Sequence, residues 1–173
     1  MLGDPLLMFD PFENRVSRDI RNQLSEQFLI ALTSKEWEPV DNFSNKLKKQ
    51  APDQAHIDFI ANRMTSYHNV FNQAGKTPLE NLQLARLLWD HKLYFECHEW
   101  LEEIWLEAEG NFKKAIQGLI RMAGAHVLHE AGRMEPAKSS AQKAIKLILD
   151  NKNSFPEAFD ADELLKELST LSS

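Results

Sequence analysis

Apolar residues recur every three or four positions along most of this chain, which is the repeat of an amphipathic helix. In the first half, apolar residues follow at steps of four: Val16, Ile20, Leu24, Phe28 and Leu32. Leucine and alanine together number 39 residues, against 8 valines plus threonines, a balance that favours helix over strand. The sequence therefore predicts an all-α fold of seven or eight helices, arranged as an antiparallel bundle or as a short stack of helical hairpins.

Capping signals indicate where the helices begin. Residues 10–13 read Asp-Pro-Phe-Glu and residues 77–80 read Thr-Pro-Leu-Glu, two capping boxes with proline at the first helical position. Asp160 is expected to cap a last short helix, and Gly75 and Gly132 to end helices before it. Three further helices are expected over residues 93–109, 112–131 and 135–150. A module boundary near residues 75–78 then divides the chain into an N-terminal helical region, 1–75, and a helical hairpin module, 76–173.

Charge is concentrated in one predicted helix. The chain carries 26 acidic and 20 basic side chains, for a net charge of −6, and the stretch Glu96–Glu109 holds six glutamates with no lysine or arginine. Glu96, Glu103 and Glu107 are expected to face water. No cluster of basic residues forms a groove for a phosphate backbone, so the sequence argues against nucleic-acid binding.

The remaining composition excludes other classes. The lone Cys97 rules out an internal disulfide and a multi-cysteine zinc site, and its apolar neighbours predict a buried, inert thiol. No apolar run is long enough to cross a bilayer, and the N-terminus lacks the basic segment of a secretory signal. We therefore expect a cytoplasmic protein without a membrane partner.

The densest chemistry lies in residues 94–105 and in the helix that follows. His98 and Glu102, four residues apart, share an edge of the buried arc beside Trp105, while His126, His129 and Glu130 lie late in the next helix. An antiparallel hairpin could bring these histidines and carboxylates together, as in bundle sites for a divalent metal ion. Two alternatives stay open: a structural His–Glu pair that fixes the helix crossing, and acid–base catalysis without a metal.

Known catalytic motifs are missing from the sequence. Six glycines form neither a phosphate-binding loop nor a dinucleotide fingerprint, and Ser25, Ser139 and Ser140 lie in helical stretches without a nucleophile elbow. Trp100 projects opposite His98 on the helical wheel, and an outward tryptophan beside Glu103 is typical of a partner surface. Whether the chain is an enzyme stays open.

One segment resembles a known family. Residues 95–102 (Phe-Glu-Cys-His-Glu-Trp-Leu-Glu), Trp105, residues 117–120 (Gln-Gly-Leu-Ile), Ala123, Gly132 and Ala137 are similar to the uncharacterised helical family called domain of unknown function 309. The resemblance covers roughly residues 84–149. It implies a small all-α helical array and no established activity, and it maps the family's polar motif onto His98, Glu99, Glu102, Trp105 and Gln117.

The sequence as a whole favours a non-enzymatic interaction module, which binds another protein or a second copy of itself. The acidic helix, the outward Trp100 and the missing catalytic motifs are the reasons. The alternative hypothesis is a metal-dependent or acid–base enzyme centred on His98, Glu102, His126 and His129.

Overall fold

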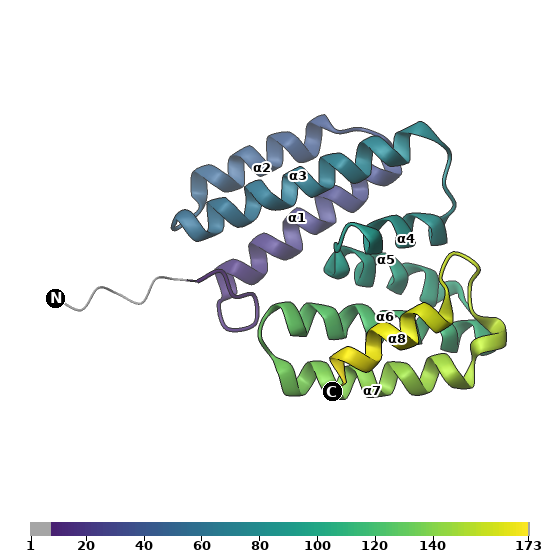
Figure 1. Cartoon of the computed structure of the whole chain (residues 1–173). Helices are drawn as coiled ribbons and strands as arrows, with labels where there is room; N and C mark the ends of the chain where they lie inside the picture. Colours follow the sequence, from purple (N-terminus) through teal and green to yellow (C-terminus); the bar gives the residue numbers. More distant parts are fainter. Residues whose placement is uncertain (1–7, 173) are drawn as a thin grey trace. The chain divides into compact units, whose positions relative to one another are not determined.

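The computed structural model describes residues 8–172, and within them every regular element is a helix (Figure 1). The helices are α1 (Arg15–Ser34), α2 (Glu38–Gln50), α3 (Gln54–Lys76), α4 (Asn81–Asp90), α5 (Tyr94–Glu107), α6 (Gly110–Glu130), α7 (Met134–Asp150) and α8 (Ala161–Leu171), with a short 3-10 turn at Lys152–Ser154. The prediction of an all-α protein with seven or eight helices is confirmed. Two compact units divide the chain, one ending at Pro78 and the other beginning at Leu79.

The first unit is a three-helix arrangement of α1, α2 and α3, each packed against the other two. Leu24 and Phe28 of α1 are fully buried, and the ring of Phe28 stacks on that of Tyr67 in α3 with 3.8 Å between ring centroids. The four-residue apolar repeat of the sequence therefore forms the core face of α1 from Ile20 to Leu32.

The predicted start of α1 is wrong by several residues. The Asp10 carboxylate accepts hydrogen bonds from the backbone amides of Phe12 and Glu13, but these close a turn rather than a helix. The helix begins at Arg15, with Asn14 as its cap. Val16 is consequently exposed, and the buried position one residue later is taken by Ser17.

The second capping box also starts its helix later than predicted. α4 begins at Asn81 rather than directly after Thr77, and the side chain of Gln83 accepts a hydrogen bond from the backbone amide of Glu80. A side chain three residues into the helix thus satisfies one free amide at its start, which is the same physical device at a different position.

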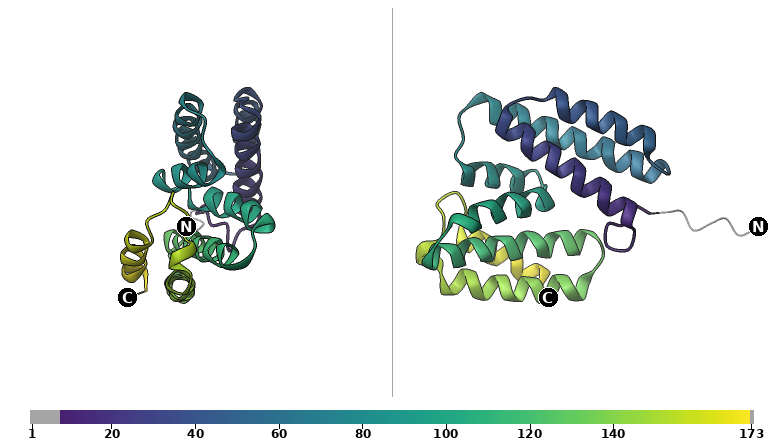
Figure 2. Two further views of the ribbon diagram at one scale, coloured as in Figure 1. Left: turned by 90° about the vertical axis from the view of Figure 1, so that its right-hand side faces the viewer. Right: turned by 180° about the vertical axis from the view of Figure 1, so that it is seen from behind.

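The second unit is built around α6, which packs against α5, α7 and α8 (Figure 2). Small residues of α7 lie in its buried face, among them Ala137, Ala141 and Ala144. Gly118 of α6 lies directly against α7, because a Cβ atom there would come within 3.1 Å of Ile148 Cγ1. Gly132 takes the left-handed backbone conformation, φ +71°, that ends α6.

The last helix returns across α6 and α7. Asp160 caps α8 by accepting from the backbone amides of Asp162 and Glu163, as predicted from the sequence. Leu164 and Leu168 are buried on the inner face of α8. This return brings α8 side chains to the end of α6, which decides where His126 finds its partner.

Candidate functional site on helix α5

Helix α5 lies between α4 and α6 in the second unit. Cys97 is fully buried, and its thiol donates to the backbone carbonyl of Ala85 in α4 at 3.3 Å. Burial raises the pKa of the Cys97 thiol far above its usual range, and the nearby carboxylates of Glu96 and Asp90 add to this shift. The thiol is therefore protonated and enclosed, so the prediction of an inert cysteine is confirmed.

His98 stands between two carboxylates of its own helix. Its Nδ1 atom is 3.3 Å from Glu99 Oε1 and its Nε2 atom is 3.7 Å from Glu102 Oε1. The His98 side chain is 27% exposed, against 42% for Glu99 and 50% for Glu102, so the imidazole lies at the border of the core and the carboxylates reach solvent. One ligand-type atom from each residue fits within 4.8 Å of the others, and no other such group of three occurs in residues 8–172.

The imidazole of His98 packs against a glycine of the neighbouring helix. A Cβ atom on Gly124 would lie 3.8 Å from His98 Cδ2. Because α5 and α6 run antiparallel, Trp105 lies two turns beyond His98 at the level of Gln117, which lies two turns before Gly124. The motif residues Trp105 and Gln117 thus share the α5–α6 seam with His98. Trp105 is covered on one face by Lys113 Nζ, 4.3 Å from its ring centroid.

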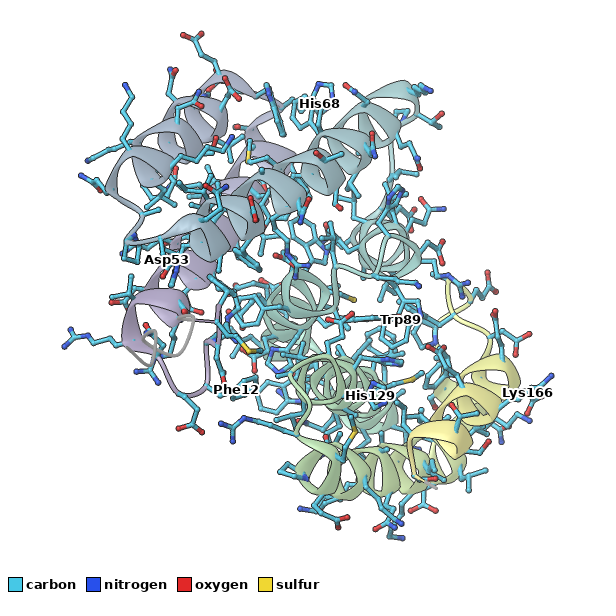
Figure 3. All side chains as sticks on the ribbon, turned by 60° about the vertical axis from the view of Figure 1, so that its left-hand side comes forward. Phe12, Asp53, His68, Trp89, His129 and Lys166 are labelled. Atoms are coloured by element: carbon cyan, nitrogen blue, oxygen red, sulfur yellow. The ribbon has the colours of Figure 1, made fainter. Side chains whose placement is uncertain are left out.

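His126 belongs to a different cluster. Its Nε2 atom lies 3.0 Å from Glu167 Oε1 of α8, and its ring stacks on Tyr94 with 4.2 Å between centroids. Trp89, labelled in Figure 3, meets the His126 ring edge to face. This pairing of α6 with α8 could not be seen in the α5–α6 hairpin alone.

The five residues His98, Glu102, His126, His129 and Glu130 do not converge in the described part of the chain. His126 turns to Glu167, and His129 and Glu130 are exposed near the end of α6. His98 gains Glu99 instead, although the helical wheel placed Glu99 about 100° away from it. The glutamate side chain is long enough to bend back to the imidazole.

Tyr94 is enclosed by the His126 cluster. Burial raises the pKa of its phenol to about 12, and the negative charges of Glu167 and Glu130 add to the rise. The Tyr94 hydroxyl therefore stays protonated across the physiological range, so it acts as a neutral packing partner for the His126 ring.

Two expectations about the outward side of α5 are corrected. Glu96 is fully buried rather than facing water, because α4 packs against the first turns of α5. Trp100 is partly buried, and its indole N–H donates to the backbone carbonyl of Asn81 at 2.9 Å. Trp100 therefore anchors the start of α4, a role that a helical wheel of α5 alone cannot reveal.

The rest of the outward side of α5 is acidic and open. Glu102, Glu103 and Glu107 are exposed, and Leu106 is 63% exposed in the same two turns. Leu106 lies three and four residues after two of these glutamates, so their carboxylates flank it on the helix surface. We call Glu102, Glu103, Leu106 and Glu107 the acidic face of α5.

A buried Ser–His–Asp network in the first unit was missed in the sequence. Ser17 Oγ is 2.9 Å from His56 Nε2, and His56 Nδ1 is 2.7 Å from Asp53 Oδ1. The hydrogen bond from His56 holds the pKa of the Asp53 carboxyl below its ordinary value. The order of atoms matches a catalytic triad, but Ser17 and His56 are 0% exposed. The network joins the first turns of α1 and α3, and no substrate can reach the hydroxyl.

Comparisons with known proteins bear on the second unit alone. No helix in residues 8–172 is long and apolar enough to cross a membrane. No curated protein and no solved structure matched the chain. Residues 82–139 match the sequence model of one family, which begins two residues before and ends ten residues before the segment whose resemblance was noted in the sequence. The stretch from α4 to the start of α7 therefore belongs to the family Domain of unknown function (DUF309).

Proposed function

We propose that this chain is a non-enzymatic, cytoplasmic interaction module that docks a basic protein segment on the acidic face of α5. The observation that carries the proposal is Leu106, which is 63% exposed between the carboxylates of Glu102 and Glu103. An exposed leucine loses free energy by contact with water, and a partner that covers it recovers this cost.

The charge around Leu106 defines the partner. Glu102, Glu103 and Glu107 repel a phosphate backbone and attract lysine or arginine side chains. A second copy of this chain would bring the same acidic face and repel it, since the whole chain carries a net charge of −6. The partner that fits is therefore another protein with basic residues around an apolar side chain, which inserts beside Leu106.

The two units divide the work in this proposal. The described first unit holds its polar groups in a sealed network, whereas the second unit places its acidic face on a helix that α4 and α6 hold in position. A rigid helix is a suitable base for docking because few side chains need to be ordered when the partner binds.

Affinity capture with the full chain tests the proposal. Leu106→Asp and Glu103→Lys should each reduce recovery of the partner at least tenfold, and recovery by the wild type should fall with added salt. Leu149→Asp on α7 is the matched control, because Leu149 is exposed to a similar degree, 56% against 63% for Leu106. Equal loss of recovery with Leu149→Asp, or unchanged recovery with Leu106→Asp, would show that the acidic face is not the docking surface.

Trp100→Ala is a poor test of the same surface. Its indole N–H holds the backbone of Asn81, so its removal loosens the start of α4. A loss of recovery with Trp100→Ala could reflect this loosening, whereas Leu106 and Glu103 are exposed and lie apart from the core.

A further inference from the structure

We infer that His98, Glu99 and Glu102 form a site for one first-row divalent metal ion such as Zn²⁺, with His98 Nε2 and Glu102 as its protein ligands. The inference is independent of the docking proposal, which assigns recognition to Leu106 and Glu103. It rests on the positions of three side chains of α5 and of Gly124 on α6.

The distance between His98 and Glu102 is the first step. Nε2 and Oε1 are 3.7 Å apart, which is longer than a hydrogen bond between these atoms. Two ligand atoms that bind the same tetrahedral zinc at about 2.1 Å lie about 3.4 Å apart. The pair is thus too wide for a direct hydrogen bond and within a few tenths of an ångström of the spacing that a shared metal ion needs.

The second step is the other nitrogen of the imidazole. Nδ1 of His98 is buried and has no well-aligned hydrogen-bond partner among the described residues, although Glu99 Oε1 lies 3.3 Å away. A metal-binding histidine usually donates its other N–H to a carboxylate, which fixes the tautomer and the ring orientation. A small rotation of the exposed Glu99 side chain completes that arrangement and satisfies the buried nitrogen.

The packing of the ring is the third step. His98 Cδ2 faces Gly124, where the missing side chain leaves room for the edge of the imidazole against α6. The ring is therefore held by the core on one side, while Glu102 reaches solvent on the other. The remaining coordination positions of the ion are open to water, which suits a borderline ion with nitrogen and oxygen ligands.

Titration of the metal-stripped full chain with Zn²⁺, followed by calorimetry, tests the site. The wild type should bind one equivalent. His98→Ala should abolish binding, Glu102→Gln should weaken it at least tenfold, and Glu99→Gln should weaken it about 10- to 100-fold, the usual effect of a partner that orients the ligand. Co²⁺ should give visible absorption bands in the wild type that are lost with His98→Ala.

His126→Ala and His129→Ala serve as controls, because these histidines lie outside the site. Both variants should keep the full equivalent of Zn²⁺. Less than about a tenth of an equivalent in the wild type, unchanged binding by His98→Ala, or loss of binding with either control variant would each overturn the inference. Glu102→Gln changes an exposed side chain and should leave thermal unfolding unchanged, so its result does not depend on whether His98→Ala folds.

Discussion

His126 and Glu167 join α6 to α8: Nε2 of the largely buried imidazole lies 3.0 Å from the carboxylate oxygen of a helix that begins 35 residues later in the sequence. Glu167→Gln removes the negative charge beside this nitrogen and should lower the free energy of unfolding by about 1–2 kcal/mol. Lys166→Gln is the matched control, since Lys166 is exposed on the same helix and should change stability by less than about 0.5 kcal/mol (Figure 3). Urea unfolding of the three proteins decides between these results, and equal stability of Glu167→Gln and wild type would contradict the role assigned to the pair.

Tyr94 makes stability depend on alkaline pH. Its pKa is raised from 10 to about 12 in the folded chain, so its stabilising contribution is fully present below pH 10 and is lost as the pH rises through 12. At pH 12 the difference amounts to roughly 2–3 kcal/mol. Between pH 9 and 12 the wild type should therefore lose more stability than Tyr94→Phe, which has no phenol to ionise. Parallel stability curves for the two proteins would show that the Tyr94 phenol is not held neutral by its surroundings.

Asp53 should give the opposite dependence at acid pH. The hydrogen bond from His56 lowers the pKa of Asp53 below its ordinary value of 3.8. The contribution of the carboxylate is present above pH 3.8 and is lost as the pH falls through the lowered value. Asp53→Asn should thus be less stable than wild type at pH 6, and the two proteins should converge on acidification. A constant difference down to pH 2 would argue against the hydrogen bond.

Gly118 and Gly124 should respond differently to alanine. Alanine favours a helix interior by about 1 kcal/mol over glycine. At Gly124 the new Cβ has an ordinary contact of 3.8 Å, so Gly124→Ala should stabilise the chain. At Gly118 the new Cβ meets Ile148 Cγ1 at 3.1 Å and Leu147 Cβ at 3.3 Å, so Gly118→Ala should be at least about 1 kcal/mol less stable than Gly124→Ala. Thermal unfolding that ranks the two variants in the reverse order would refute the close approach of α6 and α7.

Most of the fold could be predicted from the sequence because local signals determine helices. The apolar repeat from Ile20 to Leu32 places the core face of α1, and the Asp160 cap places the start of α8. The exact starts of α1 and α4 could not be predicted, since Asn14 and Glu80 are close in sequence to the signals that seemed stronger. Which of several nearby caps forms depends on tertiary packing, as at Ser17, whose hydroxyl contacts His56 in another helix.

The candidate site could be predicted only where its residues share one helix. His98 and Glu102 lie together because four residues make about one turn. The partners of His126 and Trp100 come from α8 and α4, so a wheel of α5 or α6 could not identify Glu167 or Asn81. The burial of Glu96 has the same cause, since the sequence of α5 does not indicate which helices cover it.

Site-specific photocrosslinking at position 106 measures most directly whether the acidic face of α5 meets a partner. With p-benzoylphenylalanine in place of Leu106, irradiation in cells should give one covalent product, attached through a lysine- or arginine-rich segment of another protein. The same group in place of the similarly exposed Leu149 should give none. Crosslinking at Leu149 alone, or a product at position 106 that joins two copies of this chain, would contradict the account.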